Sequence, residues 1–360
     1  MMKKIRKALI SVSDKKDLGF LLKNLKRYKI EVISSGGTFK EIKRLGYKCV
    51  ELSKYTGSPE ILDGRVKTLH PKIHAGILSK RNNKKHTKEL KNNNFSEIDL
   101  VIVNFYPFEN VFKKTNDNKK IIENIDIGGP TLVRAAAKNY NDVTVITDAK
   151  YYKNLINELN SNKGFTSLDF RKEMSEIAFT ETAYYDSVIS NYFSINSKKI
   201  FKEKKIIYGK LLKELRYGEN PHQKAILYSK DNDIGLNQLN GKELSYNNYG
   251  DIFSSLLISK SLPKNVGTVI VKHSNPCGVS VNRDHKKSYN LALSSDPISA
   301  FGGVVCCNFK INLSIAKELY KSFYEVVIGN GIEKKALKIL KKRKNLRVID
   351  SSKLNINYLE

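Results

Sequence analysis

The first part of the chain alternates apolar runs with stretches of helical spacing. Residues 7–12 (KALISV) are apolar and rich in β-branched side chains, and residues 14–28 then carry leucines on one helical face. The same succession of an apolar run and a helical stretch recurs from residue 30. The run is IEVIS at 30–34, and the short helix after it ends at Gly46, a residue typical of helix C-termini. This pattern predicts strand, helix, strand and helix in succession.

Two more apolar runs, 98–103 (IDLVIV) and 142–147 (DVTVIT), predict buried strands, and the segment 131–139 (TLVRAAAKN) between them predicts a helix. Strands that alternate with helices favour a mostly parallel sheet with helices on its faces. The fold class expected for this part of the chain is therefore α/β.

Helical spacing dominates from about 149 to 194, and the longest helix is predicted over roughly 167–194. Its expected inward side chains are Phe170, Met174, Ile177 and Phe179. The stretch from Asn196 to Lys210 is rich in lysine and ambiguous, so we place a boundary near residue 200. We expect one domain over 1–200 and a second region over 201–360.

The pattern restarts in the second region. A turn-rich segment reaches about 248, a helix is predicted from about 249 to 261, and VGTVIVKH at 266–273 predicts a strand. Further α/β sequence continues to the end, with no internal repeat and no low-complexity tract.

Composition supports a folded protein, with 40% apolar and 9% aromatic residues in 360. No stretch of 18 apolar residues occurs, and the apolar run near the N-terminus is too short for a signal peptide or membrane span, so we expect a cytoplasmic protein that binds no membrane. The few, unevenly placed cysteines fit free thiols in a reducing compartment. They are Cys49, Cys277, Cys306 and Cys307.

A formal charge of +28 invites a nucleic-acid interpretation. The lysines are spread along the whole chain, however, and no basic-region or zinc-finger pattern accompanies them. We therefore interpret the charge as a solvated cationic surface and expect no nucleic-acid partner; attraction of small anionic substrates is compatible with it.

Polar residues follow the predicted strands, where ligands bind in open α/β sheets. Ser11, Ser13 and Lys15 follow the first strand, and SGGT at 35–38 follows the second and opens a helix, a position that favours a phosphate. Taken alone, a Gly-Gly turn before a helix is equally ordinary loop chemistry.

Three further strings add donors and acidic or aromatic groups: GRVKTLHP at 64–71, NFYPF at 104–108 and DIGGPTLVRAAAKN at 126–139. The first is dense in donors for an anion, although a solvated basic loop would look the same. Singly, Tyr106 is as compatible with packing, and Asp126 with helix capping, as either is with function.

In this order and spacing, the strings SVSDK, SGGT, GRVKTLHP, NFYPF and DIGG…RAAAKN closely resemble the bifunctional purine enzymes that join inosine monophosphate (IMP) cyclohydrolase to aminoimidazole carboxamide ribonucleotide (AICAR) transformylase. The resemblance implies an N-terminal domain similar to methylglyoxal synthase. It implies that the nucleotide phosphate is held by Ser13, Lys15, Ser35, Gly36, Gly37, Thr38, Arg65 and Thr68. The base is expected to lie against Lys67, Asn104, Tyr106, Asp126, Gly128 and Lys138.

The reaction implied is attack of a carboxamide nitrogen on a formyl carbon of the same molecule, with loss of water, for which positioning is a large share of catalysis. Our hypothesis is that Lys67 and Tyr106 donate to the departing formyl oxygen while Asp126 and Lys138 handle the amide proton.

The second region extends the resemblance through LRYGENPHQ, LNGKELSYNN, VKHSNPCG and DPISAFGG. In the family these belong to a transformylase built from units like cytidine deaminase, which uses 10-formyltetrahydrofolate as co-substrate. By resemblance, Lys272 and His273 supply proton transfer. The expected nucleotide contacts are Arg216, Tyr217, Asn247, Phe301 and Gly302. His273 as a satisfied histidine at a strand end, and a structural role for His222, remain alternatives.

A deaminase-like fold raises the question of zinc, which such enzymes bind with H-x-E and P-C-x-x-C. Here GVS follows Cys277, no H-x-E occurs, and Cys306 and Cys307 are adjacent, which suits tetrahedral ligation poorly. We therefore expect no metal and no bound cofactor.

The family's chains continue beyond the point where this sequence stops, so we expect the transformylase region to be incomplete, in a protein that is C-terminally truncated relative to its family. The family is dimeric, which predicts a homodimer that binds AICAR, formyl-AICAR, IMP and folate. The alternatives are a lyase like methylglyoxal synthase and a regulatory module that binds a nucleotide without turnover. GRVKTLHP and the second region argue against the lyase, which needs neither. The combination of Lys67, Tyr106, Asp126 and Lys138 argues against the regulatory module, which would not need groups that handle protons.

Overall fold

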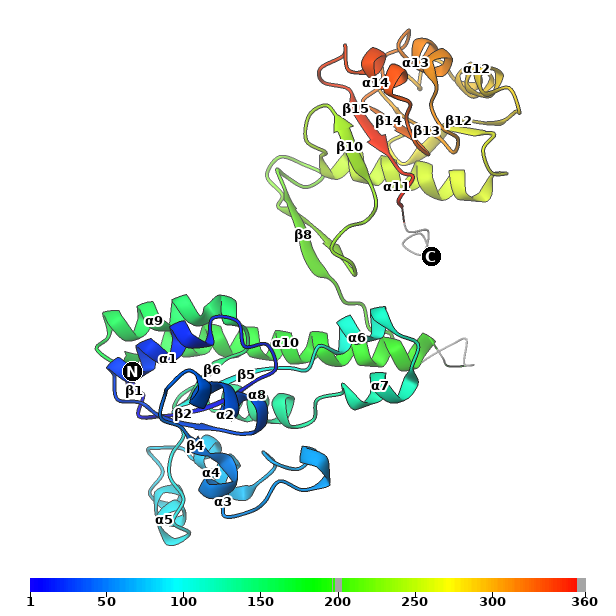
Figure 1. Cartoon of the computed structure of the whole chain (residues 1–360). Helices are drawn as coiled ribbons and strands as arrows, with labels where there is room; N and C mark the ends of the chain where they lie inside the picture. Colours follow the sequence, from blue (N-terminus) through cyan, green and yellow to red (C-terminus); the bar gives the residue numbers. More distant parts are fainter. Residues whose placement is uncertain (196, 198–202, 355–360) are drawn as a thin grey trace. The chain divides into compact units, whose positions relative to one another are not determined.

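The computed structural model describes residues 1–195, 197 and 203–354. It separates into two units, Met1–Ile207 and Tyr208–Glu360, which are described one at a time. Figure 1 shows a helix-covered sheet in each.

The sheet of the first unit has five parallel strands in the order β4-β3-β2-β5-β6. Their bounds are β2 Lys7–Val12, β3 Glu31–Ser34, β4 Val50–Glu51, β5 Leu100–Asn104 and β6 Thr144–Ile146. Strand β2 lies at the centre, and the apolar residues of β2, β5 and β6 are buried. The parallel sheet expected from the alternating pattern is confirmed.

Five helices match predicted segments: α1 Leu18–Arg27, α2 Gly36–Arg44, α8 Gly128–Lys138, α9 Tyr152–Ser161 and α10 Leu168–Ile195. Five shorter ones were not predicted: α3 Leu52–Thr56, α4 Pro71–Leu78, α5 Lys84–Asn92, α6 Phe108–Lys114 and α7 Asn118–Glu123. The reason is clearest in α5 (KKHTKELKN), which buries only Leu90 and so has no apolar periodicity. Two 3₁₀ turns, Leu62–Gly64 and Ala149–Tyr151, and the small pair β1 Lys3–Lys4 with β7 Phe165–Thr166 complete the unit.

The inward face of α10 was predicted correctly except at one residue. Phe170 and Met174 are buried and Ile177 packs partly buried against the core, whereas Phe179 is 40% exposed. Ala178, four residues after Met174, takes the inward position. Phe179 is one residue further, which rotates it by about 100° around the helix axis and out of the core.

The second unit contains a six-stranded mixed sheet in the order β10-β15-β14-β13-β11-β12. Its strands are β10 Asn237–Asn240, β11 Gly267–Lys272, β12 Asn275–Val281, β13 Val304–Cys307, β14 Val326–Gly329 and β15 Arg347–Asp350. Helix α11 (Tyr246–Ser261) shares one core cluster with the sheet, and α12 (His285–Ser295), α13 (Leu313–Leu319) and α14 (Lys334–Leu340) share the other.

The segment expected to be rich in turns up to about 248 also contains strands, so that prediction was incomplete. Strand β10 lies within it, and β8 (Lys210–Leu215) and β9 (Ala225–Ser229) form an antiparallel hairpin there. No residue of β8 (KLLKEL) is buried and its apolar residues do not alternate with polar ones, so the period that signals a strand is missing.

Cys306 and Cys307 are neighbours in β13, and they enter different core clusters because successive strand residues point to opposite faces. Among the described residues, no group of three or more His, Cys, Asp or Glu side chains gathers where it could hold a metal ion. No helix in the described ranges is long and apolar enough to cross a membrane.

Arg171 of α10 is fully buried and joins three parts of the first unit. Its guanidinium donates to the carbonyl oxygens of Tyr140, Asn141, Thr166 and Met1. Burial lowers its pKa, yet the carbonyl oxygens supply the acceptors that a buried guanidinium needs.

We expect Arg171→Met to lower the free energy of unfolding by about 3–5 kcal/mol, because it leaves several buried carbonyl oxygens without donors. Urea denaturation measures this, with Lys172→Met, an exposed neighbour on the same helix, as the matched control. A loss below about 1 kcal/mol would contradict the assigned role of Arg171.

Candidate functional site

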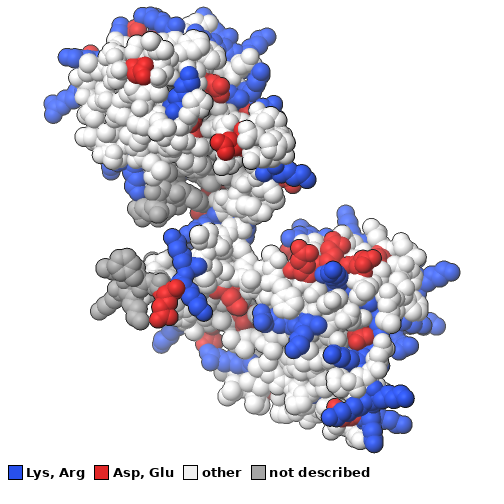
Figure 2. All heavy atoms as spheres, turned by 180° about the vertical axis from the view of Figure 1, so that it is seen from behind, with Lys and Arg blue, Asp and Glu red and all other residues white. Residues whose placement is uncertain are grey.

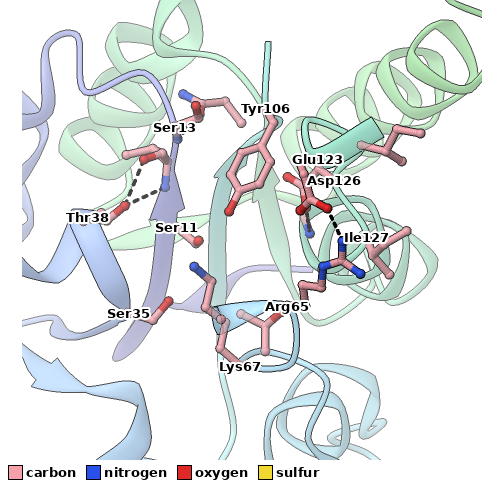
Figure 3. A pocket seen from close by; sticks show the side chains of 18 of the residues that line it. Ser11, Ser13, Ser35, Thr38, Arg65, Lys67, Tyr106, Glu123, Asp126 and Ile127 are labelled. Carbon is pink, nitrogen blue, oxygen red and sulfur yellow. Dashed lines mark hydrogen bonds and ion pairs between the residues drawn. The ribbon is translucent and has the colours of Figure 1, made fainter. Parts of the chain in front are cut away.

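A cavity of about 620 Å³ lies at the carboxyl ends of β2, β3 and β5 in the first unit (Figure 3). Its wall comes from the β2–α1 loop, the start of α2, the loop before α4, the β5–α6 loop and the turn between α7 and α8. The predicted residues that line it are Ser13, Lys15, Ser35, Gly37, Thr38, Arg65, Lys67, Thr68, Asn104, Tyr106, Asp126 and Gly128.

The N-terminus of α2 carries unused hydrogen-bond donors. The first N–H groups of any helix lack intrahelical acceptors, and they carry the positive end of the helix dipole. Beside them, the hydroxyl of Ser35 is buried without a partner in the described structure. Gly36 opens the helix with φ +50°, a conformation that glycine adopts without strain. The arrangement suits an anion.

Thr38 has a different role from Ser35, although both belong to the SGGT string. Its hydroxyl accepts from the Val12 N–H at 3.0 Å and donates to the Val12 carbonyl at 2.9 Å. The side chain thus ties α2 to the end of β2, and only the backbone N–H of Thr38 remains for a ligand.

Asn104, the last residue of β5, holds the β2–α1 loop in place. Its Oδ1 accepts from the N–H groups of Ser13 at 2.5 Å and Asp14 at 3.1 Å, and its Nδ2 donates to the Asp14 carbonyl at 2.9 Å. These three bonds use most of the side chain's capacity. They fix the loop that carries Lys15.

Lys67 and Tyr106 point into the middle of the cavity from opposite walls (Figure 3). The amine of Lys67 is so close to Gly36 that a β-carbon there would lie 3.4 Å from Nζ. Tyr106 is 39% exposed, so it does not serve as a core residue.

Asp126 caps the start of α8 and faces the cavity. Its Oδ1 accepts from the Gly129 N–H at 2.8 Å, and its own N–H donates to the Tyr185 hydroxyl at 2.9 Å. Burial raises the pKa of the Asp126 carboxyl above its ordinary value, although the N–H groups of Gly129 and Tyr106 and the charge of Lys67 favour the ionised form. Capping and a cavity-facing carboxyl are thus combined in one residue.

Glycine is required where the turn before α8 meets the loop before α4. A β-carbon at Gly128 would collide with the hydroxyl oxygen of Thr68. The Thr68 side chain therefore packs directly against the backbone at the start of α8.

Glu123 was not predicted, yet it lines the cavity and forms an ion pair with Arg65. It lies at the end of α7, three residues before Asp126, and belongs to none of the strings singled out in the sequence. Ser11, Ile122, Ile125 and Ile127 line the cavity as well.

Two predicted residues are not among those that line the cavity. Gly36 lies directly behind it, next to Lys67. Lys138 is exposed in the last turn of α8, roughly 15 Å along the helix axis from Gly128, whose end of the helix faces the cavity. The structure thus does not bring Lys138 to Asp126 in this cavity, and its part in the reaction stays a prediction.

In the second unit, Lys272 and His273 lie where β11 turns into β12. The amine of Lys272 donates to the carbonyl of Phe301 at 2.8 Å, beside Gly302. His273 and Ser274 both have positive φ, 51° and 60°, as the two central residues of a tight hairpin turn require.

Asp251 of α11 holds this turn by accepting the Ser274 N–H at 2.7 Å, a contact that sequence analysis did not predict. Asn247, one helical turn earlier, donates to the Glu219 carbonyl at 3.4 Å. That segment also carries Arg216, whose guanidinium lies 5.5 Å from the ring centroid of Tyr217.

Two family models match the chain, and the boundary between their matches lies inside the first unit. The AICARFT/IMPCHase bienzyme family matches residues 136–358, and the MGS-like domain matches residues 17–131.

The chain is 43% identical over 353 residues to the bifunctional purine biosynthesis protein PurH of Bradyrhizobium diazoefficiens, covering 96% of this chain and 67% of that protein. It is 45% identical over 355 residues to PurH of Persephonella marina, covering 96% and 68%. The chain therefore spans about two thirds of the length of these relatives. The crystal structure of ForH aligns with 52% of the chain at 28% identity, with a TM-score of 0.47.

We expect Ser35→Ala to weaken binding of IMP about tenfold while leaving the stability of the free protein unchanged, because the hydroxyl has no partner until a ligand arrives. Isothermal titration calorimetry measures the affinity. The matched variant is Thr38→Val, which strands the N–H and carbonyl of Val12 and should lower the free energy of unfolding by about 1–3 kcal/mol. Equal effects of the two substitutions on binding would show that Ser35 has no special role.

Asp126→Asn tests the raised pKa. Between the unfolded pKa, about 3.9, and the higher folded pKa, the folded protein holds a proton that the unfolded chain has lost. The stability of the wild type relative to Asp126→Asn should therefore fall as pH rises through this window and level off above it.

Urea denaturation of both proteins from pH 4 to pH 8 measures this difference, with Asp14→Asn, an exposed aspartate, as the control. A difference that grows with pH would mean that the fold stabilises the ionised carboxylate.

Proposed function

The chain belongs to the AICARFT/IMPCHase bienzyme family, and we propose that its first unit catalyses the closure of formyl-AICAR to IMP in the cavity described above. The family's two activities are formyl transfer to AICAR, with 10-formyltetrahydrofolate as co-substrate, and this cyclisation. The protein is accordingly an enzyme of purine biosynthesis. The domain assignment that we propose is cyclohydrolase over residues 1–200 and transformylase from 201 onward.

One observation carries the proposal for the first unit. The buried, unpartnered hydroxyl of Ser35 and the free N–H groups of α2 line the same cavity as Lys67, Tyr106 and Asp126. An anion site alone would suit any phosphate ester. Its combination with an amine, a phenol and a carboxyl of raised pKa suits a reaction in which protons move.

We place the phosphate at the Ser35 end of the cavity, with Lys15 and the N–H group of Gly37 from its wall and the N–H group of Gly36 next to it. Arg65, grouped with these residues on sequence grounds, lies on the opposite side of the cavity beside Glu123, Asp126 and Ile127 (Figure 3). We therefore assign Arg65 to the base end.

The closure forms one C–N bond, between the carboxamide nitrogen and the formyl carbon, and breaks the bond from that carbon to the formyl oxygen. The oxygen leaves as water, taking one proton from the carboxamide nitrogen and one from the formamido nitrogen. Lys67 and Tyr106 donate to the departing oxygen, and Asp126 takes the carboxamide proton. Holding the two reacting groups in one conformer supplies much of the rate enhancement.

In the second unit, Lys272 and His273 are the proposed proton-transfer groups, with Arg216, Tyr217, Asn247, Phe301 and Gly302 around the nucleotide. The hairpin turn that displays His273 is supported by Asp251 through Ser274. Asp251 thus acts as a positioning residue for the turn.

We also propose a cytoplasmic homodimer that binds neither nucleic acid nor membrane. Figure 2 supports the point on nucleic acid, because Lys and Arg are spread over the visible surface with Asp and Glu among them, and they do not gather in one stripe.

We expect Lys67→Ala to reduce the rate of formyl-AICAR cyclisation at least 100-fold while weakening IMP binding far less, because the amine acts mainly on the charge that develops in the transition state. Single-turnover absorbance and calorimetry on the 360-residue protein separate the two effects. Lys16→Ala, an exposed lysine outside the cavity wall, is the matched control.

Full turnover by Lys67→Ala would contradict its proposed role. IMP binding by a wild type that does not cyclise formyl-AICAR would favour the regulatory module that binds without turnover.

A further inference from the structure

Arg65 and Glu123 form an ion pair inside the candidate active site. Glu123 is not among the site residues that the resemblance to the family implies. Both side chains line the cavity, and both are accessible to it, with exposed fractions of 65% and 58%. Figure 3 shows the pair on the same side as Asp126 and Ile127. An exposed ion pair contributes little to the free energy of unfolding, so stability does not explain why the two side chains meet here.

The backbone on each side of the pair is fixed independently of it. The segment that carries Arg65 is closed by a bridge between Ile61 and Val66. On the other side, the Tyr185 hydroxyl donates to the Asn124 carbonyl at 3.1 Å and accepts from the Asp126 N–H at 2.9 Å, so the turn after Glu123 is held to α10. The two charged groups therefore meet because the fold brings them together.

The pair presents a definite hydrogen-bond pattern to a ligand. A guanidinium has five N–H donors, of which the contact with Glu123 occupies few, and a carboxylate has a second oxygen that still accepts. A donor beside an acceptor complements a group that has a carbonyl oxygen beside an N–H. Carboxamides and lactams are such groups.

We propose that Glu123, together with Arg65, recognises the carboxamide of formyl-AICAR and the lactam edge of IMP, the carbonyl oxygen accepting from Arg65 and the adjacent N–H donating to Glu123. The inference rests on the proposed cyclohydrolase function and names a further specificity residue for it. It also gives each proton of the carboxamide nitrogen a partner. One is lost to Asp126 on ring closure, and the other, retained in the product, faces Glu123.

Adenosine monophosphate (AMP) provides the discriminating ligand, because at the same edge it has an amino donor beside a ring-nitrogen acceptor. That pattern is the reverse of the lactam. The amino group of AMP would face the Arg65 donors, and its ring nitrogen would face the Glu123 acceptor. AMP should therefore bind more weakly than IMP wherever this pair contacts the base.

The test is calorimetric binding of IMP and AMP to the wild type and to Glu123→Gln, with formyl-AICAR turnover measured on the same preparations. Glutamine keeps the length of the side chain but can donate as well as accept. We expect IMP binding and the KM for formyl-AICAR to worsen about tenfold, AMP binding to stay equal or improve, and kcat to change less than about threefold. The preference for IMP over AMP should thus fall by about tenfold or more.

Glu41→Gln is the matched control, because Glu41 forms an exposed ion pair with Arg44 in the same unit outside the cavity wall. It should leave the preference for IMP unchanged, and melting temperatures should show that both variants are folded.

Two results would overturn the inference. One is an unchanged preference for IMP over AMP, including equal weakening of both nucleotides, and the other is tighter binding of both, which would mean that Glu123 merely competes with ligands for Arg65. A collapse of kcat at unchanged affinity would also reject it and make Glu123 a proton acceptor. Failure of the wild type to cyclise formyl-AICAR, with the preference for IMP intact, would instead reject the proposed cyclohydrolase function.

Discussion

The parallel pairing of β2 with β3 on one side and β5 on the other determines where three of the segments that line the cavity begin. Parallel strands end at one edge of the sheet, so the segments that follow them converge there. Two side chains make this convergence rigid: Thr38 bonds both backbone groups of Val12, and Asn104 bonds Ser13 and Asp14. Asn104 is itself a strand residue, so a shift of β5 by one residue would turn its side chain to the other face of the sheet and break its contacts.

The sequence predicted the elements whose physical origin is local. The apolar residues of strands β2, β5 and β6 are buried and form apolar runs in the sequence, and α10 shows helical spacing over most of its length. The short polar helices and the exposed hairpin β8–β9 carry no such period, because tertiary contacts and connecting loops decide them. Phe179 shows the same limit at a single residue, since one step around a helix separates a core position from an exposed one.

For the site, sequence motifs indicated most of the residues that line the cavity but not what each does. Ser35 and Thr38 stand in one string, and only their three-dimensional surroundings show that the Thr38 hydroxyl is occupied while the Ser35 hydroxyl is free in the described structure. No feature of the sequence marked Glu123 as a site residue, because a single glutamate near the end of a polar helix resembles any solvent-exposed residue. Lys138 stood in a strong motif, although it lies at the end of α8 that is remote from the cavity.

Unused hydrogen-bonding capacity separates the residues that build the site from those available to a ligand. The side chains of Thr38 and Asn104 form their hydrogen bonds with backbone groups, so substituting either residue would disturb the loops that build the site. Arg65 and Glu123 use only part of their hydrogen-bonding capacity on each other, and both line the cavity. An N–H donor of Arg65 and an oxygen acceptor of Glu123 therefore remain for a ligand. In the second unit, Asp251 takes the architectural role by holding a turn of two residues with positive φ, a strained conformation that leaves His273 displayed. In both units, fully bonded residues fix the backbone so that a few partly bonded ones can act.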